Sequence, residues 1–184
     1  MKKNKTIFFS GGGTGGPVTP LLALMEKMMK DYPNYNYYFL GTKFGPEKKM
    51  IEAENLAQTC HYLSLEAGKW RRYFSLNNFF DLFKIFYSFF QSLYYLIKYQ
   101  AKIVVSAGAY VSVPLVYAAY LLRIPVIIHQ QDILPGLANR LMARVAKKVG
   151  LSFERSLKYF PSKGVLIGNP YRQELIETIN EKKG

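Results

Sequence analysis

Near the start of the chain, the sequence reads Thr6-Ile-Phe-Phe-Ser-Gly-Gly-Gly-Thr-Gly-Gly-Pro-Val-Thr-Pro20. Its apolar run, Thr6 to Phe9, is typical of a buried strand, and the glycines that follow are typical of a tight turn. Pro20 stands where a helix through about Lys30 would begin, because proline is tolerated in the first turn of a helix. The stretch therefore predicts a strand, a glycine turn and a helix in succession.

Short apolar runs and helix-like segments continue to alternate along the rest of the chain. We expect further strands at 37–40, 62–65, 103–105, 126–128, 149–151 and 165–167, and further helices at 46–55, 79–99, 113–122, 135–146 and 173–180. Strands that alternate with helices form a parallel sheet with helices on both faces. The sequence thus predicts a doubly wound, mostly parallel, Rossmann-like α/β fold.

The composition indicates which kinds of molecule the protein is expected to bind. The 184 residues include 25 Lys plus Arg against 12 Asp plus Glu, a formal charge of +13, which favours nucleic acid, an anionic lipid surface or a phosphate-bearing substrate. No nucleic-acid-binding motif is present, so we expect no nucleic-acid partner. Cys60 is the only cysteine and the two histidines lie far apart in sequence, so we expect neither an internal disulfide nor a metal site.

Neither export nor a transmembrane helix is expected. The apolar part of the first ten residues is only Ile7 to Phe9, which is too short for the core of a signal peptide. The aromatic stretch at 79–97 contains Asp81, Lys84 and Gln91, whereas a membrane span needs roughly 20 residues with few or no charges.

The first glycine turn is a candidate phosphate site, because doubly wound sheets bind ligands beyond the carboxyl ends of their strands. Gly11, Gly13 and Gly16 satisfy the pattern G-x-G-x-x-G, whose backbone N–H groups can cradle a diphosphate at a helix N-terminus. A dinucleotide is disfavoured, since the second strand leads into Gly41-Thr-Lys43 rather than an acidic residue. A phosphate or sugar-diphosphate cradle is favoured, and a tight turn without a ligand is the alternative.

Two further loops carry unusual residues at the same predicted edge. The segment from Ser106 to Ser112 is a second small-residue turn, and two such turns side by side suit one extended anionic ligand. Four polar side chains, His129 to Asp132, follow an apolar strand, and apolar periodicity does not explain them. For His129 a structural and a catalytic role are equally supported. Asn139 and Arg140 could face the same cleft.

Aromatic and basic residues are concentrated between Trp70 and Tyr99. One helical stripe is expected to pack on the sheet; it consists of Phe79, Phe83, Phe86, Phe90, Leu93 and Ile97. Aromatic residues outside that stripe, next to basic residues, are typical of a surface that binds an anionic membrane peripherally. The residues that we assign to this membrane surface are Trp70, Arg71, Arg72, Phe80 and Phe89.

Six blocks of the sequence, at 11–20, 68–75, 107–114, 124–132, 135–140 and 168–172, together resemble one family. They read GGGTGGPVTP, GKWRRYFS, AGAYVSVP, IPVIIHQQD, PGLANR and GNPYR. In this order they resemble the MurG family, the bacterial UDP-N-acetylglucosamine:lipid I N-acetylglucosaminyltransferases. The resemblance implies the N-terminal half of a two-domain GT-B glycosyltransferase. Residues 1–167 would be its acceptor-binding, membrane-associating domain and 168–184 the start of the interdomain linker, with the donor-binding domain absent.

By this resemblance the chain is the acceptor half of an inverting enzyme of peptidoglycan synthesis. That enzyme moves GlcNAc from UDP-GlcNAc to undecaprenyl-diphospho-MurNAc-pentapeptide, lipid I, at the cytoplasmic face of the cell membrane and without a cofactor. A missing C-terminal domain or a partner subunit would bind UDP-GlcNAc, so this chain alone would be inactive. The alternative is a non-catalytic subunit of a split glycosyltransferase that binds a lipid diphosphate or the membrane.

The resemblance also implies which residues form the site. Those assigned to the acceptor diphosphate are Gly13, Thr14, Gly15, Gly16, Gly108 and Tyr110, and those assigned to the rest of the cleft are Gln131 and Asn139. Many members have histidine at the position of Pro17 and glutamate at that of Gln130, so the usual general base has no counterpart here. Asp132 is the remaining carboxylate of the third loop and our candidate base or orienting group, with His129 as its rival.

Overall fold

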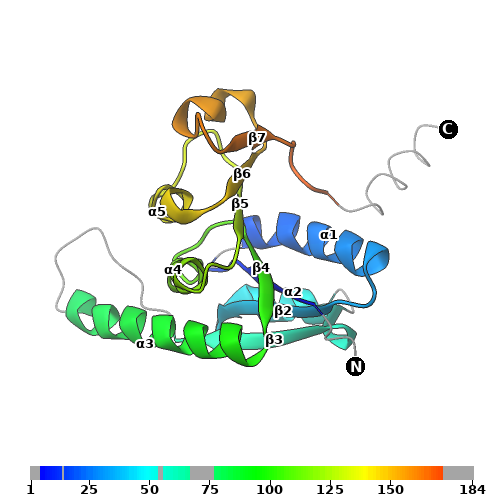
Figure 1. Ribbon diagram of the computed structural model, residues 1–184, viewed down its shortest axis with the longest axis vertical. Helices are drawn as coiled ribbons and strands as arrows, with labels where there is room; N and C mark the ends of the chain where they lie inside the picture. The colour runs from blue at the N-terminus through cyan, green and yellow to red at the C-terminus, as the bar shows by residue number, and fades with distance from the viewer. Residues whose placement is uncertain (1–4, 14, 54–55, 67–76, 172–184) are drawn as a thin grey trace.

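The computed structural model describes residues 5–13, 15–53, 56–66 and 77–171 (Figure 1). Its seven parallel strands form one sheet in the order β3-β2-β1-β4-β5-β6-β7. The strands are β1 (Thr6–Ser10), β2 (Asn36–Thr42), β3 (Cys60–Leu65), β4 (Ala101–Ser106), β5 (Val126–Gln130), β6 (Lys148–Leu151) and β7 (Gly164–Leu166). This order, in which the chain moves outward in both directions from β1, confirms the doubly wound parallel fold.

Within the described residues, five helices cover the two faces of the sheet. They are α1 (Gly15–Asp31), α2 (Pro46–Ala53), α3 (Asn77–Lys98), α4 (Ser112–Leu121) and α5 (Leu137–Val145), and two short 3₁₀ helices are η1 (Leu56–Gln58) and η2 (Glu154–Tyr159). Figure 1 shows α1 and α2 on one face and α3, α4 and α5 on the other. Two clusters of buried apolar side chains, one on each side of the sheet, fill the space between the sheet and its helices. The helix expected at 173–180 lies outside the described residues.

The central strand is apolar because it is covered on both sides. All five residues of β1 are buried, and Phe8 and Phe9 belong to opposite core clusters, as the alternation of side chains along a strand requires. The glycine turn is shorter than the sequence suggests, since α1 begins at Gly15 and not at Pro20. Pro20 therefore lies inside the helix, where its side chain is buried.

The expected packing face of α3 was largely wrong, since among the described side chains of that face only Leu93 packs against the core. Phe83, Phe86 and Phe90 are 57–64% exposed and point away from the sheet. The helix instead packs through a neighbouring face on which Ser88, Ser92 and Leu96 are buried, and the two small serines let α3 approach its neighbours closely. Hydrophobicity alone selects the larger aromatic stripe, but the size of the side chains decides which face fits.

The inverted orientation of α3 bears on the residues that we assigned to the membrane surface. Phe89 is half-buried and packs against the core cluster that includes Leu96 and Leu115, so it does not belong to the outward face of α3. Trp70, Arg71 and Arg72 lie outside the described residues, and so does the side chain of Phe80.

Candidate functional site

The first two loops meet at the carboxyl edge of the sheet because β1 and β4 are neighbours. Ser10 pairs with Ser106 at the ends of these strands. The hydroxyl oxygens of Ser10 and Ser112 lie 2.9 Å apart in a buried hydrogen bond, and the Ala107 N–H donates to the Ser10 carbonyl at 3.4 Å. The second loop is therefore held directly beside the first.

Left-handed backbone conformations shape both turns. Gly13 has φ +79° in the first turn, and Gly108 and Ala109 have φ +104° and +75° in the second. A Cβ at Gly13 would lie 3.2 Å from the ring of Tyr110, and one at Gly108 would lie 2.9 Å from the Asn139 side-chain oxygen. Glycine at these two positions thus lets the turns, and the groups on neighbouring elements, approach one another.

The structure brings several of the predicted site residues to one place. Gly13 and Tyr110 lie next to each other where the two turns meet, and Gly15 and Gly16 form the first residues of α1. Thr14 lies outside the described residues. Backbone N–H groups at the start of a helix of 17 residues are ready donors for an anion.

A second part of the site is a small pocket of about 120 Å³ between the second and third loops. Gly108, Gln131, Asp132 and Asn139, four of the predicted residues, line it together with Pro17. Because Asp132 is exposed, its carboxylate can meet a ligand that enters from solvent.

A chain of amide groups fixes the third loop. Asn139 is buried, and its Nδ2 donates to Gln130 Oε1 at 2.6 Å and to the His129 carbonyl at 3.3 Å. Gln130 in turn donates from Nε2 to the Asp132 carbonyl at 2.6 Å. The two neutral side chains therefore hold the backbone on which the Asp132 carboxylate is mounted.

His129 faces away from this pocket. Its Nε2 lies 3.3 Å from the Gly168 carbonyl oxygen and 3.2 Å from the Ser152 hydroxyl, and its Nδ1 is buried without a partner. Burial lowers the pKa of His129, and the smaller effect of the Gly168 hydrogen bond acts in the opposite direction. The structure thus separates the two candidate bases: Asp132 lines the pocket and His129 joins β5 to the segment after β7.

The comparison with protein families agrees with this geometry. Residues 7–151 match the family described as the glycosyltransferase family 28 N-terminal domain. The chain belongs to this family. Within the described part of the chain, no group of three His, Cys, Asp or Glu side chains is placed to hold a metal ion.

Curated relatives of the family are similar over nearly the whole chain. One from Clostridium novyi (strain NT) is 44% identical over 178 residues, and one from Borrelia turicatae (strain 91E135) is 40% identical over 175 residues. Both are named UDP-N-acetylglucosamine--N-acetylmuramyl-(pentapeptide) pyrophosphoryl-undecaprenol N-acetylglucosamine transferase. The matches cover 96% and 95% of this chain and 48% of each relative, so the chain spans about half their length.

Solved structures give the same result. The crystal structure of Acinetobacter baumannii MurG matches with a TM-score of 0.72 and 30% identity, over 92% of this chain and 46% of that one. UDP-GlcNAc 2-epimerase from Neisseria meningitidis, bound to UDP-GlcNAc, has a TM-score of 0.68 at 14% identity, over 97% of this chain and 50% of that one, and shows the shared fold alone. The predicted resemblance to the MurG family, over its N-terminal half, is confirmed.

Glu47 is a buried residue beside the site that sequence reasoning did not identify. It lies in the first turn of α2, and its Oε1 accepts hydrogen bonds from the Thr42 N–H at 2.5 Å and the Thr42 hydroxyl at 2.6 Å, whereas Oε2 has no partner. Gly12, Gly41 and Gly45 surround the carboxylate, and a Cβ at Gly12 would lie 2.6 Å from Oε1. Glutamate is favoured in a first helical turn, but the sequence does not reveal this glycine niche.

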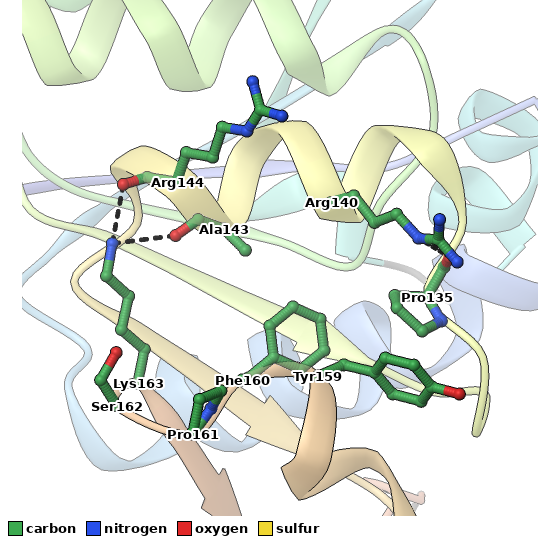
Figure 2. Close-up of a pocket in the computed structure, with 9 residues that line it drawn as sticks. All are labelled: Pro135, Arg140, Ala143, Arg144, Tyr159, Phe160, Pro161, Ser162 and Lys163. Carbon is green, nitrogen blue, oxygen red and sulfur yellow. Dashed lines mark hydrogen bonds between the residues drawn. The ribbon is translucent and has the colours of Figure 1, made fainter.

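A cavity of about 490 Å³ lies between α5 and η2, and of the residues considered for the site only Arg140 lines it (Figure 2). The Lys163 ammonium donates to the carbonyls of Ala143 at 2.9 Å and Arg144 at 2.8 Å, at the carboxyl end of α5. Arg140, which we expected at the cleft, lines this cavity instead and donates from Nε to the Pro135 carbonyl at 3.0 Å. These bonds stabilise the end of a helix and its entry loop, and they account for the positions of Lys163 and Arg140.

Gly41→Ala should destabilise the fold by about 1–3 kcal/mol, because a Cβ there would lie 2.5 Å from the Tyr62 hydroxyl and 2.6 Å from Glu47 Cγ. Neither neighbour can move freely, since Tyr62 donates to the Thr42 carbonyl at 2.6 Å. Urea denaturation measures the change. Gly136→Ala is the matched control, because nothing lies within 4 Å of its added Cβ. Equal losses in the two variants would contradict the niche.

Stability should fall as the pH is lowered from 7.5 to 5, in part through His129. Its lowered pKa means that the unfolded chain binds a proton more readily than the folded one, so stability present near neutral pH is lost below the unfolded pKa of about 6.5. His129→Gln should weaken this dependence in urea denaturation at several pH values. An NMR titration of His129 with a midpoint at or above that of an unstructured histidine would refute the prediction.

Proposed function

We propose that this chain is the acceptor-binding half of a glycosyltransferase that moves GlcNAc from UDP-GlcNAc to a lipid-linked diphospho-MurNAc-pentapeptide in peptidoglycan synthesis. The observation that carries the proposal is the meeting of the two glycine turns, Gly13 against Tyr110, beside the pocket that contains Asp132. The names of the relatives supply the two substrates. UDP-GlcNAc would bind to a second half beyond a linker that begins at Gly168, or to a partner subunit.

The acceptor diphosphate would bind to backbone N–H groups at the start of α1 and in the second turn. A helix N-terminus carries partial positive charge, and left-handed glycines let the backbone approach the phosphate oxygens closely. Gly15, Gly16 and Gly108 are the residues that would provide this surface.

Asp132 is the proposed base. An acceptor hydroxyl attacks the anomeric carbon of GlcNAc, UDP leaves with the bonding electrons, and the hydroxyl proton passes to the carboxylate. The Asp132 carbonyl accepts hydrogen bonds from Gln130 at 2.6 Å and from the Ser156 hydroxyl at 3.3 Å. These bonds fix the backbone and let the exposed carboxylate face the pocket. His129 is the weaker candidate, since its Nε2 is already occupied and its Nδ1 is buried.

A non-catalytic subunit that binds a lipid diphosphate is the second candidate function. Pro17 favours it, because this side chain lines the pocket beside Asp132 and can neither accept nor donate a proton. In that case the two glycine turns would keep the diphosphate and a separate protein would carry out the transfer.

The outward face of α3 supports peripheral binding at the inner leaflet of the cell membrane. We define the aromatic face as Phe83, Phe86, Tyr87, Phe90, Tyr94 and Ile97, which are 55–64% exposed. Tyr120 and Leu121, at the end of the neighbouring α4, are 59% and 63% exposed. Amphipathic surfaces of this kind bury aromatic groups at the level of lipid headgroups. None of the helices within the described ranges is long and apolar enough to cross a bilayer.

The transferase proposal is tested with a chimera in which residues 1–171 replace the matching half of the Clostridium novyi relative. We expect transfer of labelled GlcNAc from UDP-GlcNAc to lipid I, and none from this chain alone. Asp132→Asn should lower kcat by about 10²-fold or more, because general base catalysis is lost. Asp31→Asn, at the exposed end of α1, is the control. Full turnover by Asp132→Asn would exclude it as the base, and an inactive chimera that still binds lipid I would favour the second candidate function.

The membrane surface is tested by sedimentation with phosphatidylglycerol vesicles. The chain should bind at low salt and be released as salt rises, because exposed charges are screened. Phe86→Ser combined with Phe90→Ser should lower the bound fraction several-fold, since two exposed rings are lost from the aromatic face. Phe153→Ser, 49% exposed at the start of η2, is the control. Absence from the vesicles at every salt concentration would exclude this surface.

A further inference from the structure

A second cavity, of about 410 Å³, lies on the α3 side of the glycine turn. It is lined by residues from several elements that are far apart in the sequence. Those that matter here are Gly13, Lys43, Phe44, Leu65, Lys84 and Tyr110. The pocket that contains Asp132 has none of these residues among its lining, so the two hollows are separate.

The cavity lies between the glycine turns and the aromatic face of α3. Gly13 and Tyr110, which line it, belong to the two turns proposed to bind the acceptor diphosphate. Lys84, which also lines it, is on α3 next to Phe83 and two residues before Phe86, both of the aromatic face. The cavity therefore offers a path for a ligand that is bound at the glycine turns and embedded in a membrane at α3.

The lining combines two kinds of chemistry. Lys43 and Lys84 bring ammonium groups, with Glu66 as the one acidic side chain among the lining residues. Phe44, Leu65 and Tyr110 provide apolar surface, and Phe44 is 92% exposed, with the Lys43 ammonium 5.5 Å from its ring centroid. Cations beside apolar walls suit a ligand that is anionic at one end and hydrocarbon at the other.

We propose that this cavity holds the isoprene units nearest the diphosphate of the acceptor's lipid carrier and leads them from the glycine turns to the aromatic face. Lys43 and Lys84 lie beside the diphosphate, and Phe44 covers the first isoprene units. This inference rests on the proposed function, because it takes the acceptor diphosphate to be at Gly13. The acceptor's peptide, which is the other conceivable occupant, has no need to approach α3.

The test is isothermal titration of the chain with soluble probes below their micelle concentrations: inorganic pyrophosphate, geranyl diphosphate, farnesyl diphosphate and farnesol. Affinity should rise with chain length, and farnesyl diphosphate should bind at least about tenfold more tightly than pyrophosphate, because apolar surface is buried. Farnesol, which lacks the anion, should bind more weakly than farnesyl diphosphate.

Variants assign these effects to the cavity. Phe44→Ala should remove most of the gain with chain length and leave pyrophosphate affinity within about twofold, whereas Lys84→Gln should weaken all diphosphates several-fold. Phe153→Ser and Lys30→Gln, at exposed positions outside the cavity, are the matched controls.

The possible results are distinct. This inference would be overturned if pyrophosphate and farnesyl diphosphate bound with equal affinity, or if the rise in affinity with chain length persisted in Phe44→Ala. Either result would leave the proposed diphosphate site intact. If the rise in affinity with chain length were lost in Phe86→Ser with Phe90→Ser but kept in Phe44→Ala, the hydrocarbon would lie on the aromatic face. That result would also overturn this inference. Displacement of farnesyl diphosphate by a muramyl peptide would assign the cavity to the peptide. Failure of every diphosphate to bind would overturn the proposed function itself.

Discussion

The close approach of two turns at the carboxyl ends of β1 and β4 is the constraint on which the rest of the site depends. Gly13 makes it possible, because a Cβ there would press on Tyr110 of the second turn; Gly108 in turn lets the second turn approach α5, since a Cβ there would lie 2.9 Å from Asn139. The buried hydrogen bond between Ser10 and Ser112 holds the turns at this spacing. Any larger residue would widen the gap and move the backbone donors away from the diphosphate that we propose they share.

Buried polar groups keep these turns in place. Glu47 fixes the loop after β2 through Thr42, and Asn139 fixes the loop after β5 through Gln130. Such groups are costly to bury unless they are hydrogen-bonded, so each one specifies a single loop conformation. Glu47 thus supports the site without lining the small pocket at Asp132, whereas Gln130 and Asn139 both support the third loop and line that pocket.

The orientation of α3 places an exposed aromatic face near the site. Small serines beside Leu96 on the inward side allow the helix to lie close to α4, and the residues of the aromatic face remain in contact with solvent. A continuous exposed apolar surface is unfavourable in water and typically marks a contact with a membrane or another protein. Because Lys84 belongs both to this helix and to a cavity that reaches Gly13, the lipid surface and the diphosphate turn are parts of one path in our proposal.

The alternation of apolar runs and glycine turns by itself determined the doubly wound fold and the three loops at its ligand-binding edge, because strand burial and turn geometry are local properties. The motifs also indicated the family and the grouping of Gly108, Gln131, Asp132 and Asn139, which line one pocket. Three features follow from packing in the folded chain: His129 faces Gly168, Glu47 fills a niche between loops, and the aromatic face of α3 points outward. Each of these depends on which side chain fits against a neighbour distant in sequence, and no local pattern contains that information.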